Sequence, residues 1–377
     1  MKKSWIALFI VFVAILAVAA QVAAQDTTAD LSGTVRVGSW ESGDALTPWN
    51  NAIASYEAAH PNVKVQLEAV PQDYGTKLLA EFASNSAPDI FMSGDGDVAK
   101  WVALGAAEDL GPYISGSNGY DMTGLLPAVA AFGQVNGTQY YLTKDYSPLV
   151  LYYNKDLLTK AGVDAPTASW TWADLMAAAK KLTLDANGND ATSASFDATT
   201  VKQWGIQMPD GWGDTAWTRG IEPIIYANGG SLIAEDGSKL TGFMNSDATV
   251  SAVQAYVDAI KTDKVAISKT DAASFSGTDL FQSGVVAMLW TGVWPLNGYK
   301  TVDGLNFGTM GLPSGSSGNA NVLCWSGFAM YSGSQNKDAA WDFLKYIATG
   351  DGAKEFANYA WTPVVSIATD QGLDKDP

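Results

Sequence analysis

The sequence predicts an α/β fold in two lobes, each a mostly parallel sheet flanked by helices. The chain has 377 residues, more than one typical core needs and enough for two. Strand-like and helix-like segments alternate from residue 35 to residue 92. Within 140–158, two apolar β-prone runs flank Pro148, a residue that the middle of a central strand does not accommodate. We expect two extended segments there, separated by a break, where the chain crosses from one lobe to the other.

The N-terminal part carries the clearest alternation of elements. We expect strands at 35–40, 63–69 and 88–92 and helices at 47–60 and 74–83. Pro48 suits the first helical position, and the helix ends before Pro61. This order is typical of a lobe with a largely parallel sheet. We interpret His60, which precedes Pro61, as a structural residue.

The rest of the chain continues the alternation. We expect helices at 154–162, 171–182, 246–260 and 279–283, a strand at 285–290, a return crossover at 322–332 and a helix from 336. Thr171 and Asp174 form a capping box for the second of these helices. The helix that Ser246 caps is expected to bury one apolar face, which contains Val250, Val253, Val257 and Ile260.

Composition limits the partners and the chemistry. The net charge of −17 argues against nucleic acid or an anionic membrane surface as a partner. Arg36 and Arg219 are the only arginines, which disfavours a phosphate or polycarboxylate ligand. One cysteine, Cys324, excludes an internal disulfide framework, and one histidine disfavours a His-based zinc site or a Ser-His triad. We expect no cofactor and no metal.

The polar loop at 185–197 is the one segment with calcium-like spacing. Asp185, Asn187 and Asn189 stand at alternate positions, as in a calcium-binding loop. Its sixth position is Asp190 instead of glycine, and its twelfth is Phe196 instead of glutamate. These two departures favour a loop without calcium.

The N-terminus has the pattern of a secretory signal peptide, residues 1–24. Two lysines precede a continuous apolar run at 5–20, and Val22 and Ala24 supply the small residues of a cleavage site. The alternative is a retained N-terminal anchor, although the run is shorter than a membrane span. No cysteine lies near the cleavage site, so we expect an exported protein, periplasmic or extracellular, that is not a lipoprotein.

Several segments resemble the bacterial extracellular solute-binding proteins of family 1, the maltose-binding-protein-like sugar receptors of ABC transporters. These segments are 55–65 (SYEAAHPNVKV), 71–74 (PQDY), 88–97 (PDIFMSGDGD), 103–110 (ALGAAEDL), 152–158 (YYNKDLL), 170–175 (WTWADL) and 284–296 (GVVAMLWTGVWPL). The resemblance implies a type II periplasmic-binding-protein fold with the ligand in the cleft between the lobes. It also implies a monomer that closes by a hinge and delivers its sugar to a membrane permease.

The resemblance also suggests how the chain divides. Lobe 1 would comprise 25–146 and 326–377, lobe 2 would comprise 147–325, and the hinge crossovers would lie near 144–151 and 320–327. Relatives continue well past the proline that matches Pro363, with helices that close the second lobe. Here 364–377 is short and charged, so we expect those helices to be missing and an apolar patch to be exposed, as in a truncated chain.

Candidate ligand contacts follow the predicted strands or lie in the crossovers. Sugar sites combine aromatic faces with polar side chains, and α/β sheets bind ligands beyond the carboxyl ends of their strands. Asp95, Trp217 and Trp294 match positions at which relatives contact their ligands. The full set of candidates is Trp40, Glu41, Asp73, Tyr74, Asp95, Tyr146, Trp217, Trp290, Trp294 and Trp325.

Two other functions compete with a sugar-binding protein. A secreted glycoside hydrolase would need two carboxylates about 5 to 9.5 Å apart, and Glu41 and Asp95 could meet across the cleft. The chain lacks the repeating rhythm of a (β/α)8 barrel, which disfavours this alternative. A receptor for a peptide, a metal or an anion is disfavoured by the scarcity of histidine, cysteine and arginine.

Overall fold

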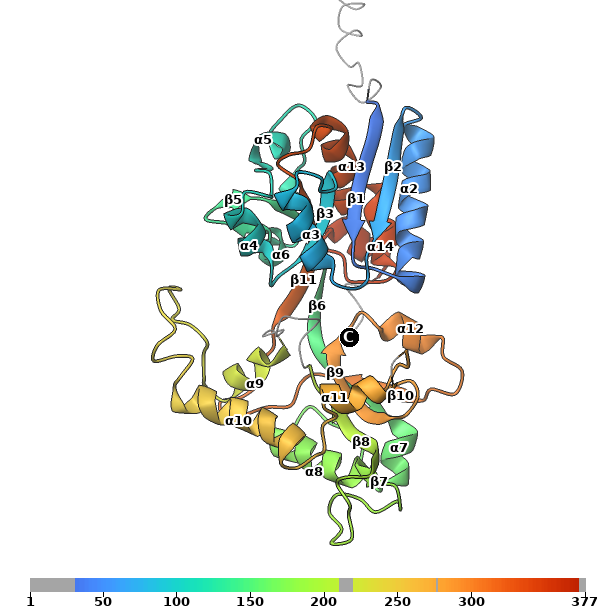
Figure 1. Cartoon of the computed structure of the whole chain (residues 1–377), viewed down its shortest axis with the longest axis vertical. Coiled ribbons are helices and arrows are strands. Elements are labelled where there is room, and N and C mark those ends of the chain that lie inside the picture. The colour runs from blue at the N-terminus through green and yellow to red at the C-terminus, as the bar shows by residue number, and fades with distance from the viewer. Residues whose placement is uncertain (1–30, 210–219, 276, 373–377) are drawn as a thin grey trace, which may run out of the picture.

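The computed structural model describes residues 31–209, 220–275 and 277–372 (Figure 1). Two lobes lie one above the other. The upper lobe contains both ends of the described chain, and the lower lobe contains its middle part. Strands and helices mix in each lobe, which confirms the predicted two-lobed α/β class. The predicted signal peptide lies outside the described residues.

The upper lobe is built on three parallel strands. Its longer elements are β1 (Gly33–Ser39), α2 (Thr47–Ala59), β2 (Val63–Ala69), α3 (Tyr74–Ala83), β3 (Ile90–Gly94), β11 (Leu323–Met330), α13 (Lys337–Thr349) and α14 (Asp351–Ala357). β1 pairs in parallel with β2 and with β3, and α2 and α3 make the connections between them. The predicted alternation of strands and helices in this part of the chain is therefore confirmed. β11 joins the sheet antiparallel to β3.

Short elements complete the upper lobe. They are η1 (Gly43–Leu46), α4 (Val98–Ala103), α5 (Gly111–Ile114), η2 (Met122–Gly124), α6 (Pro127–Ala130), β4 (Gln134–Val135), β5 (Thr138–Gln139) and α15 (Val365–Asp370). The segment after Pro363 supplies one short helix, α15, which packs on the upper lobe, so the prediction that the helices closing the second lobe are missing stays a prediction. Ile367 of α15 is buried with Val364 and Leu125, because the Leu126 N–H donates to the Pro363 carbonyl and brings the two segments together.

The outgoing crossover is one strand, β6 (Tyr141–Asn154), and not two extended segments with a break as predicted. Pro148 is accommodated because the pairing partner changes there. Residues before it pair with β11, up to the pair Pro148–Leu323, and residues from Leu149 onward pair with the lower lobe. Proline has no backbone N–H to donate. Because one ladder ends and the next begins at Pro148, the strand tolerates the missing hydrogen bond there.

The lower lobe continues the same sheet. Its elements are α7 (Lys155–Lys160), α8 (Trp172–Leu182), β7 (Leu184–Asp185), β8 (Val201–Gln207), α9 (Glu222–Ala227), α10 (Asp247–Lys261), α11 (Lys269–Ala272), η4 (Ala273–Phe275), β9 (Val286–Gly292), α12 (Leu296–Lys300) and β10 (Phe307–Met310). The strand order across both lobes is β2-β1-β3-β11-β6-β9-β8-β7, with β10 also paired to β6. β8 and β9 are parallel, whereas β6 runs antiparallel to β9 and to β11.

Helix starts follow the sequence signals closely. The Asn154 side chain accepts hydrogen bonds from the N–H groups of Asp156 and Leu157 at the start of α7. Thr171 and Asp174 form the predicted capping box at the start of α8. The Ser246 hydroxyl caps α10, also as predicted. These polar side chains satisfy N–H groups that have no partner within the helix.

The predicted buried face of α10 is wrong in part. Val250 is 54% exposed, and the buried residues of the helix are Thr249, Ala252 and Ala259. The Thr249 hydroxyl donates to the Ser231 carbonyl and accepts from the Ser231 N–H, which turns this side of the helix inward. The two alanines on the same side allow close packing, so the larger valine is left outside.

Each lobe has its own buried side chains. Clusters around Trp49, Tyr56 and Phe91 lie in the upper lobe, and clusters around Leu175 and Phe281 lie in the lower lobe. Three tryptophans on helices, Trp49, Trp101 and Trp341, are buried. His60 stacks on Tyr56 with the ring centroids 4.2 Å apart, which agrees with a structural role.

Candidate functional site

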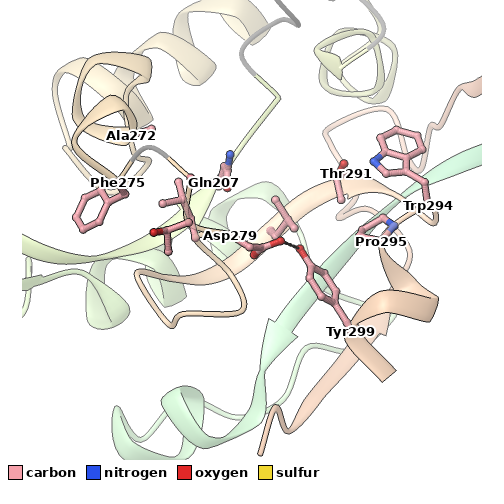
Figure 2. Close-up of a pocket in the computed structure, with 12 residues that line it drawn as sticks. Gln207, Ala272, Phe275, Asp279, Thr291, Trp294, Pro295 and Tyr299 are labelled. Atoms are coloured by element: carbon pink, nitrogen blue, oxygen red, sulfur yellow. Dashed lines mark hydrogen bonds between the residues drawn. The ribbon is translucent and has the colours of Figure 1, made fainter. Parts of the chain in front are cut away.

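A cavity of about 400 Å³ lies in the lower lobe at the carboxyl ends of two parallel strands (Figure 2). Gln207 ends β8, and Thr291 lies at the end of β9. Trp294 and Pro295 lead from β9 into α12, which contains Tyr299 and which Figure 1 shows on the side of the lobe facing the upper lobe. The cavity therefore occupies the place where open α/β sheets bind ligands.

Trp294 supplies an aromatic surface beside this cavity. Its side chain is 36% exposed and lines the cavity wall. The ring lies directly against the backbone of Gly292, where an added Cβ would come within 1.9 Å of a ring atom. Glycine at this position therefore allows the ring to pack against the end of β9. An aromatic face held in this way suits the C–H-rich face of a sugar ring.

The turn before β9 brings a carboxylate into the cavity. The segment 279–284 is a turn, and not the short helix that the sequence predicted. One oxygen of Asp279 caps the turn by accepting hydrogen bonds from the N–H groups of Phe281 and Gln282. The segment does not continue as a helix, because Gly284 adopts a left-handed φ of 75° directly after it. The other oxygen of Asp279 accepts from the Tyr299 hydroxyl at 2.9 Å (Figure 2).

In the upper lobe, two candidate contacts lie at the carboxyl ends of β1 and β3. Trp40 follows β1, and its ring lies 3.9 Å from the position of a Cβ on Gly94. Asp95 follows β3, and its N–H donates to the carbonyl of Trp325 in β11. Trp40 and Asp95 are both partly exposed. The structure thus groups an aromatic and an acidic side chain here, and their contact with a ligand stays a prediction.

Glu41 lies beside this group but is already engaged. Its carboxylate accepts hydrogen bonds from the Trp49 indole and from the Lys144 ammonium, the latter at 2.6 Å. Lys144 also contacts Asp145 at 2.8 Å, and Asp145 accepts from the hydroxyl and N–H of Ser326. We call Glu41, Lys144, Asp145 and Ser326 the hinge ion cluster.

The hinge ion cluster depends on an irregularity in β6. The pairing of β6 with β11 shifts by one residue at Lys144, so that Lys144 is an extra residue in the ladder. Such a bulge re-aims side chains, which lets Lys144 contact its own neighbour Asp145. Burial opposes the charge of Lys144, but the carboxylates of Asp145 and Glu41 outweigh it and raise the pKa of the ammonium.

Tyr146 lies on the outgoing crossover and contacts Trp361, which was not among the sequence candidates. Its N–H donates to the Trp361 carbonyl at 3.0 Å, and the two rings meet edge to face with centroids 5.9 Å apart. Both side chains are partly exposed. Trp361 therefore joins the candidates. From the sequence, only its aromatic character suggested that Trp361 could contact a ligand, because Tyr146 and Trp361 are distant in the sequence.

Three of the aromatic candidates are buried. The Tyr74 ring is in the core, and its hydroxyl accepts from the Met92 N–H. Trp290 is 2% exposed because its side chain points from β9 into the lower core, where it meets Trp172 edge to face. Trp325 is also buried, stacked on Phe132. We do not retain Tyr74, Trp290 or the Trp325 side chain as candidate contacts.

The remaining candidates lie apart from these groups. Asp73 is exposed at the position before α3, with a left-handed φ of 53°. Trp217 lies outside the described residues. Lys144, Asp145, Asp279 and Tyr299 were not among the sequence candidates, and only the polar character of the short segments that hold them could have drawn attention to them.

The loop at 185–197 is stabilised by a carboxylate. Asp185 accepts hydrogen bonds from the N–H groups of Asn187, Asn189 and Asp197 and from the Asn189 amide. The Asn189 amide bond, together with these backbone bonds, lowers the pKa of Asp185 to about 2. Within the described residues, no group of three or more histidine, cysteine or acidic side chains is placed to hold a metal. No described helix combines the length and apolarity of a membrane span.

The fold and the two strand-end groups define a two-lobed binding protein. The model of the bacterial extracellular solute-binding protein family matches residues 39–354, and this chain belongs to that family. Its members bind solutes and are not enzymes, which leaves the glycoside hydrolase alternative without support. Membership also implies an exported protein.

Individual relatives agree with this assignment. A binding protein of Brucella abortus is 25% identical over 322 residues, which are 82% of this chain and 71% of the relative. The sn-glycerol-3-phosphate-binding periplasmic protein UgpB of the same species is 29% identical over 241 residues, 62% of this chain and 51% of UgpB. Among solved structures, the ABC substrate-binding protein Lmo0181 of Listeria monocytogenes, in complex with cycloalternan, has a TM-score of 0.74. It is 28% identical, and the match covers 89% of this chain and 82% of Lmo0181.

Proposed function

We propose that this protein captures a mono- or oligosaccharide between its lobes and delivers it to the membrane permease of an ABC importer. The observation that carries the proposal is the lower-lobe cavity, where the exposed Trp294 ring lies beside the polar groups of Gln207, Asp279 and Thr291. Aromatic stacking gives affinity, and polar groups at the ring edge give orientation. The sugar complex of the similar Lmo0181 protein supports the same ligand class.

The upper lobe supplies the opposite side of the proposed site. Trp40 and Asp95 would contact the sugar from above, with Tyr146 and Trp361 at the hinge and Asp73 and Trp217 as further contacts. β6 and β11 connect the lobes, so rotation near 144–151 and 320–327 would close them over the ligand. Lobe 1 would then comprise 25–146 and 326–377, and lobe 2 would comprise 147–325. Ligand would favour the closed form through its higher affinity for that form.

Delivery requires that the protein be exported. A signal peptide at 1–24 would be removed, and the mature chain would act in the periplasm or outside the cell as a monomer without a lipid anchor. The net charge of −17 agrees with a partner other than nucleic acid.

An anionic solute is the second candidate, since UgpB binds sn-glycerol-3-phosphate. Phosphate sites favour arginine. Arg36 is engaged by Glu68 at 2.7 Å on the β1–β2 ladder, and Arg219 lies outside the described residues. This favours a neutral sugar.

The test is a titration of intrinsic tryptophan fluorescence against a panel of neutral sugars and sn-glycerol-3-phosphate, followed by calorimetry. We expect saturable binding of at least one neutral sugar, recovered chemically intact, and no binding of the phosphate ester. Binding of the phosphate ester alone would contradict the proposal, and cleavage of the sugar would restore the hydrolase alternative.

A further inference from the structure

The cavity in the lower lobe contains two adjacent acceptors, the Asp279 carboxylate and the Tyr299 hydroxyl (Figure 2). We infer that this pair determines specificity: it accepts hydrogen bonds from two neighbouring hydroxyls of a neutral sugar and rejects sugars that carry an acidic group. This inference rests on the proposed sugar-binding function and names the ligand class that this pocket selects.

The free acceptor positions follow from a count of hydrogen bonds. A carboxylate has about four lone-pair positions, two on each oxygen. Oδ1 of Asp279 uses two of them for the N–H groups of Phe281 and Gln282, at 3.0 and 2.8 Å. Oδ2 uses one for the Tyr299 hydroxyl. One position on Oδ2 therefore stays open for a ligand hydroxyl.

Tyr299 provides the second acceptor and holds the first in place. Burial, together with the charge of Asp279, raises the pKa of Tyr299, so the phenol stays protonated and donates a hydrogen bond to the Asp279 carboxylate. Its oxygen still has lone pairs that accept. The ring packs edge to face on Tyr152 with centroids 5.6 Å apart, which restricts its movement. The two acceptors are thus preorganised at a separation of 2.9 Å, suited to hydroxyls on adjacent ring carbons.

The charge of the pocket explains the rejection of acids. The twelve residues that line it include one carboxylate, that of Asp279, and neither lysine nor arginine. Asp279 forms no ion pair within the described part of the chain. An acidic group placed here would face an uncompensated negative charge at short range. Gln207 and Thr291, by contrast, offer polar groups that suit a neutral polyol.

The experiment compares matched neutral and acidic sugars: glucose with glucuronate, galactose with galacturonate and mannose with mannuronate. Calorimetry is carried out on the wild-type protein and on the variants Asp279→Asn and Tyr299→Phe. Asparagine keeps an oxygen that can cap the 279–284 turn, and melting temperatures report whether each variant folds. Asp236→Asn, which neutralises an exposed carboxylate in another loop of the lower lobe, is the matched control.

We expect the wild-type protein to bind its neutral sugar at least about ten-fold more tightly than the matching uronate. Asp279→Asn should weaken neutral binding by about ten-fold and reduce the preference to less than about three-fold. Tyr299→Phe should weaken neutral binding by a similar factor but keep the preference, since the charge remains. Asp236→Asn should change neither affinity nor preference.

Two results would overturn this inference alone, and a third would overturn the proposed function as well. Equal wild-type affinity for a sugar and its uronate would remove the selectivity, whatever the variants do. An unchanged preference in a folded Asp279→Asn protein would show that another group is responsible. Failure of the wild-type protein to bind any neutral sugar in the panel would overturn the proposed function, and this inference with it.

Discussion

Replacement of Lys144 by methionine should destabilise the upper lobe strongly. The Lys144 side chain is 6% exposed and contacts two carboxylates, Glu41 at 2.6 Å and Asp145 at 2.8 Å. Methionine keeps an apolar stem of similar size but leaves both negative charges without their cation. Breaking a buried ion pair from one side costs about 3–5 kcal/mol. Since Trp49 and Ser326 still donate to the two carboxylates, we expect a loss of about 3 kcal/mol, at the low end of that range.

The measurement is urea unfolding of the unliganded protein at pH 7, followed by circular dichroism. Lys354→Met is the control, because the Lys354–Asp351 pair lies on the surface and its loss should change stability little. A second variant that adds Glu41→Gln and Asp145→Asn to Lys144→Met should recover part of the loss, since no uncompensated charge remains.

The pH dependence gives an independent check. The pKa of Lys144 is raised in the folded state, so its stabilisation is fully present below the ordinary lysine pKa of about 10.4 and is lost only as pH rises through the raised value. The difference between Lys144→Met and wild type should therefore be constant from pH 6 to pH 9. A difference below about 1 kcal/mol at pH 7 would refute the assignment of Lys144 as a buried, doubly paired cation.

Three further predictions concern the site, the hinge and a surface loop. Trp294→Ala should weaken sugar binding by about 1–3 kcal/mol in calorimetry while changing the melting temperature of the unliganded protein much less; unchanged affinity would remove Trp294 from the site. Small-angle scattering should give a smaller radius of gyration with saturating sugar, and identical curves would contradict hinge closure. The lowered pKa of Asp185 means that its stabilisation is present above about pH 4 and is lost as pH falls toward about 2. The melting temperature of Asp185→Asn should therefore fall less than that of wild type between pH 4 and pH 2. Equal falls in the two melting temperatures would show that the carboxylate does not stabilise the loop.

Local sequence signals predicted the elements well where the deciding interactions are also local. The Asn154 cap and the Thr171–Asp174 box act within one helical turn, so spacing alone identifies them. The face of α10 could not be obtained in this way, because Ser231 in a distant segment decides how the helix is turned. Pro148 shows the same limit, since a change of pairing partner, which the sequence does not display, makes room for it.

The candidate site residues also differ in how far local sequence signals could identify them. Trp40, Asp95 and Trp294 follow apolar strands, and the rule that ligands bind at strand carboxyl ends located them from the sequence. Trp290 ends an apolar run in β9, but alternation along a strand does not tell which face of a two-sided core a side chain enters. Tyr74 begins helix α3 and packs into the upper core, which its place after β2 does not indicate. Their burial is a property of the packed sheet.

Glu41 shows how a residue at the end of a strand can have a structural role. It lies next to Trp40 at the end of β1, yet Lys144 and Trp49 occupy its oxygens. Asp145, its counterpart on β6, is occupied by Lys144 and Ser326. The acidic groups nearest the hinge therefore hold β6 and β11 together, whereas Asp279 in the lower lobe keeps an open acceptor position. It follows that substitutions in the hinge ion cluster should act first on stability, and substitutions at Asp279 and Trp294 first on affinity, although all of these residues lie at strand ends or in crossovers of one continuous sheet.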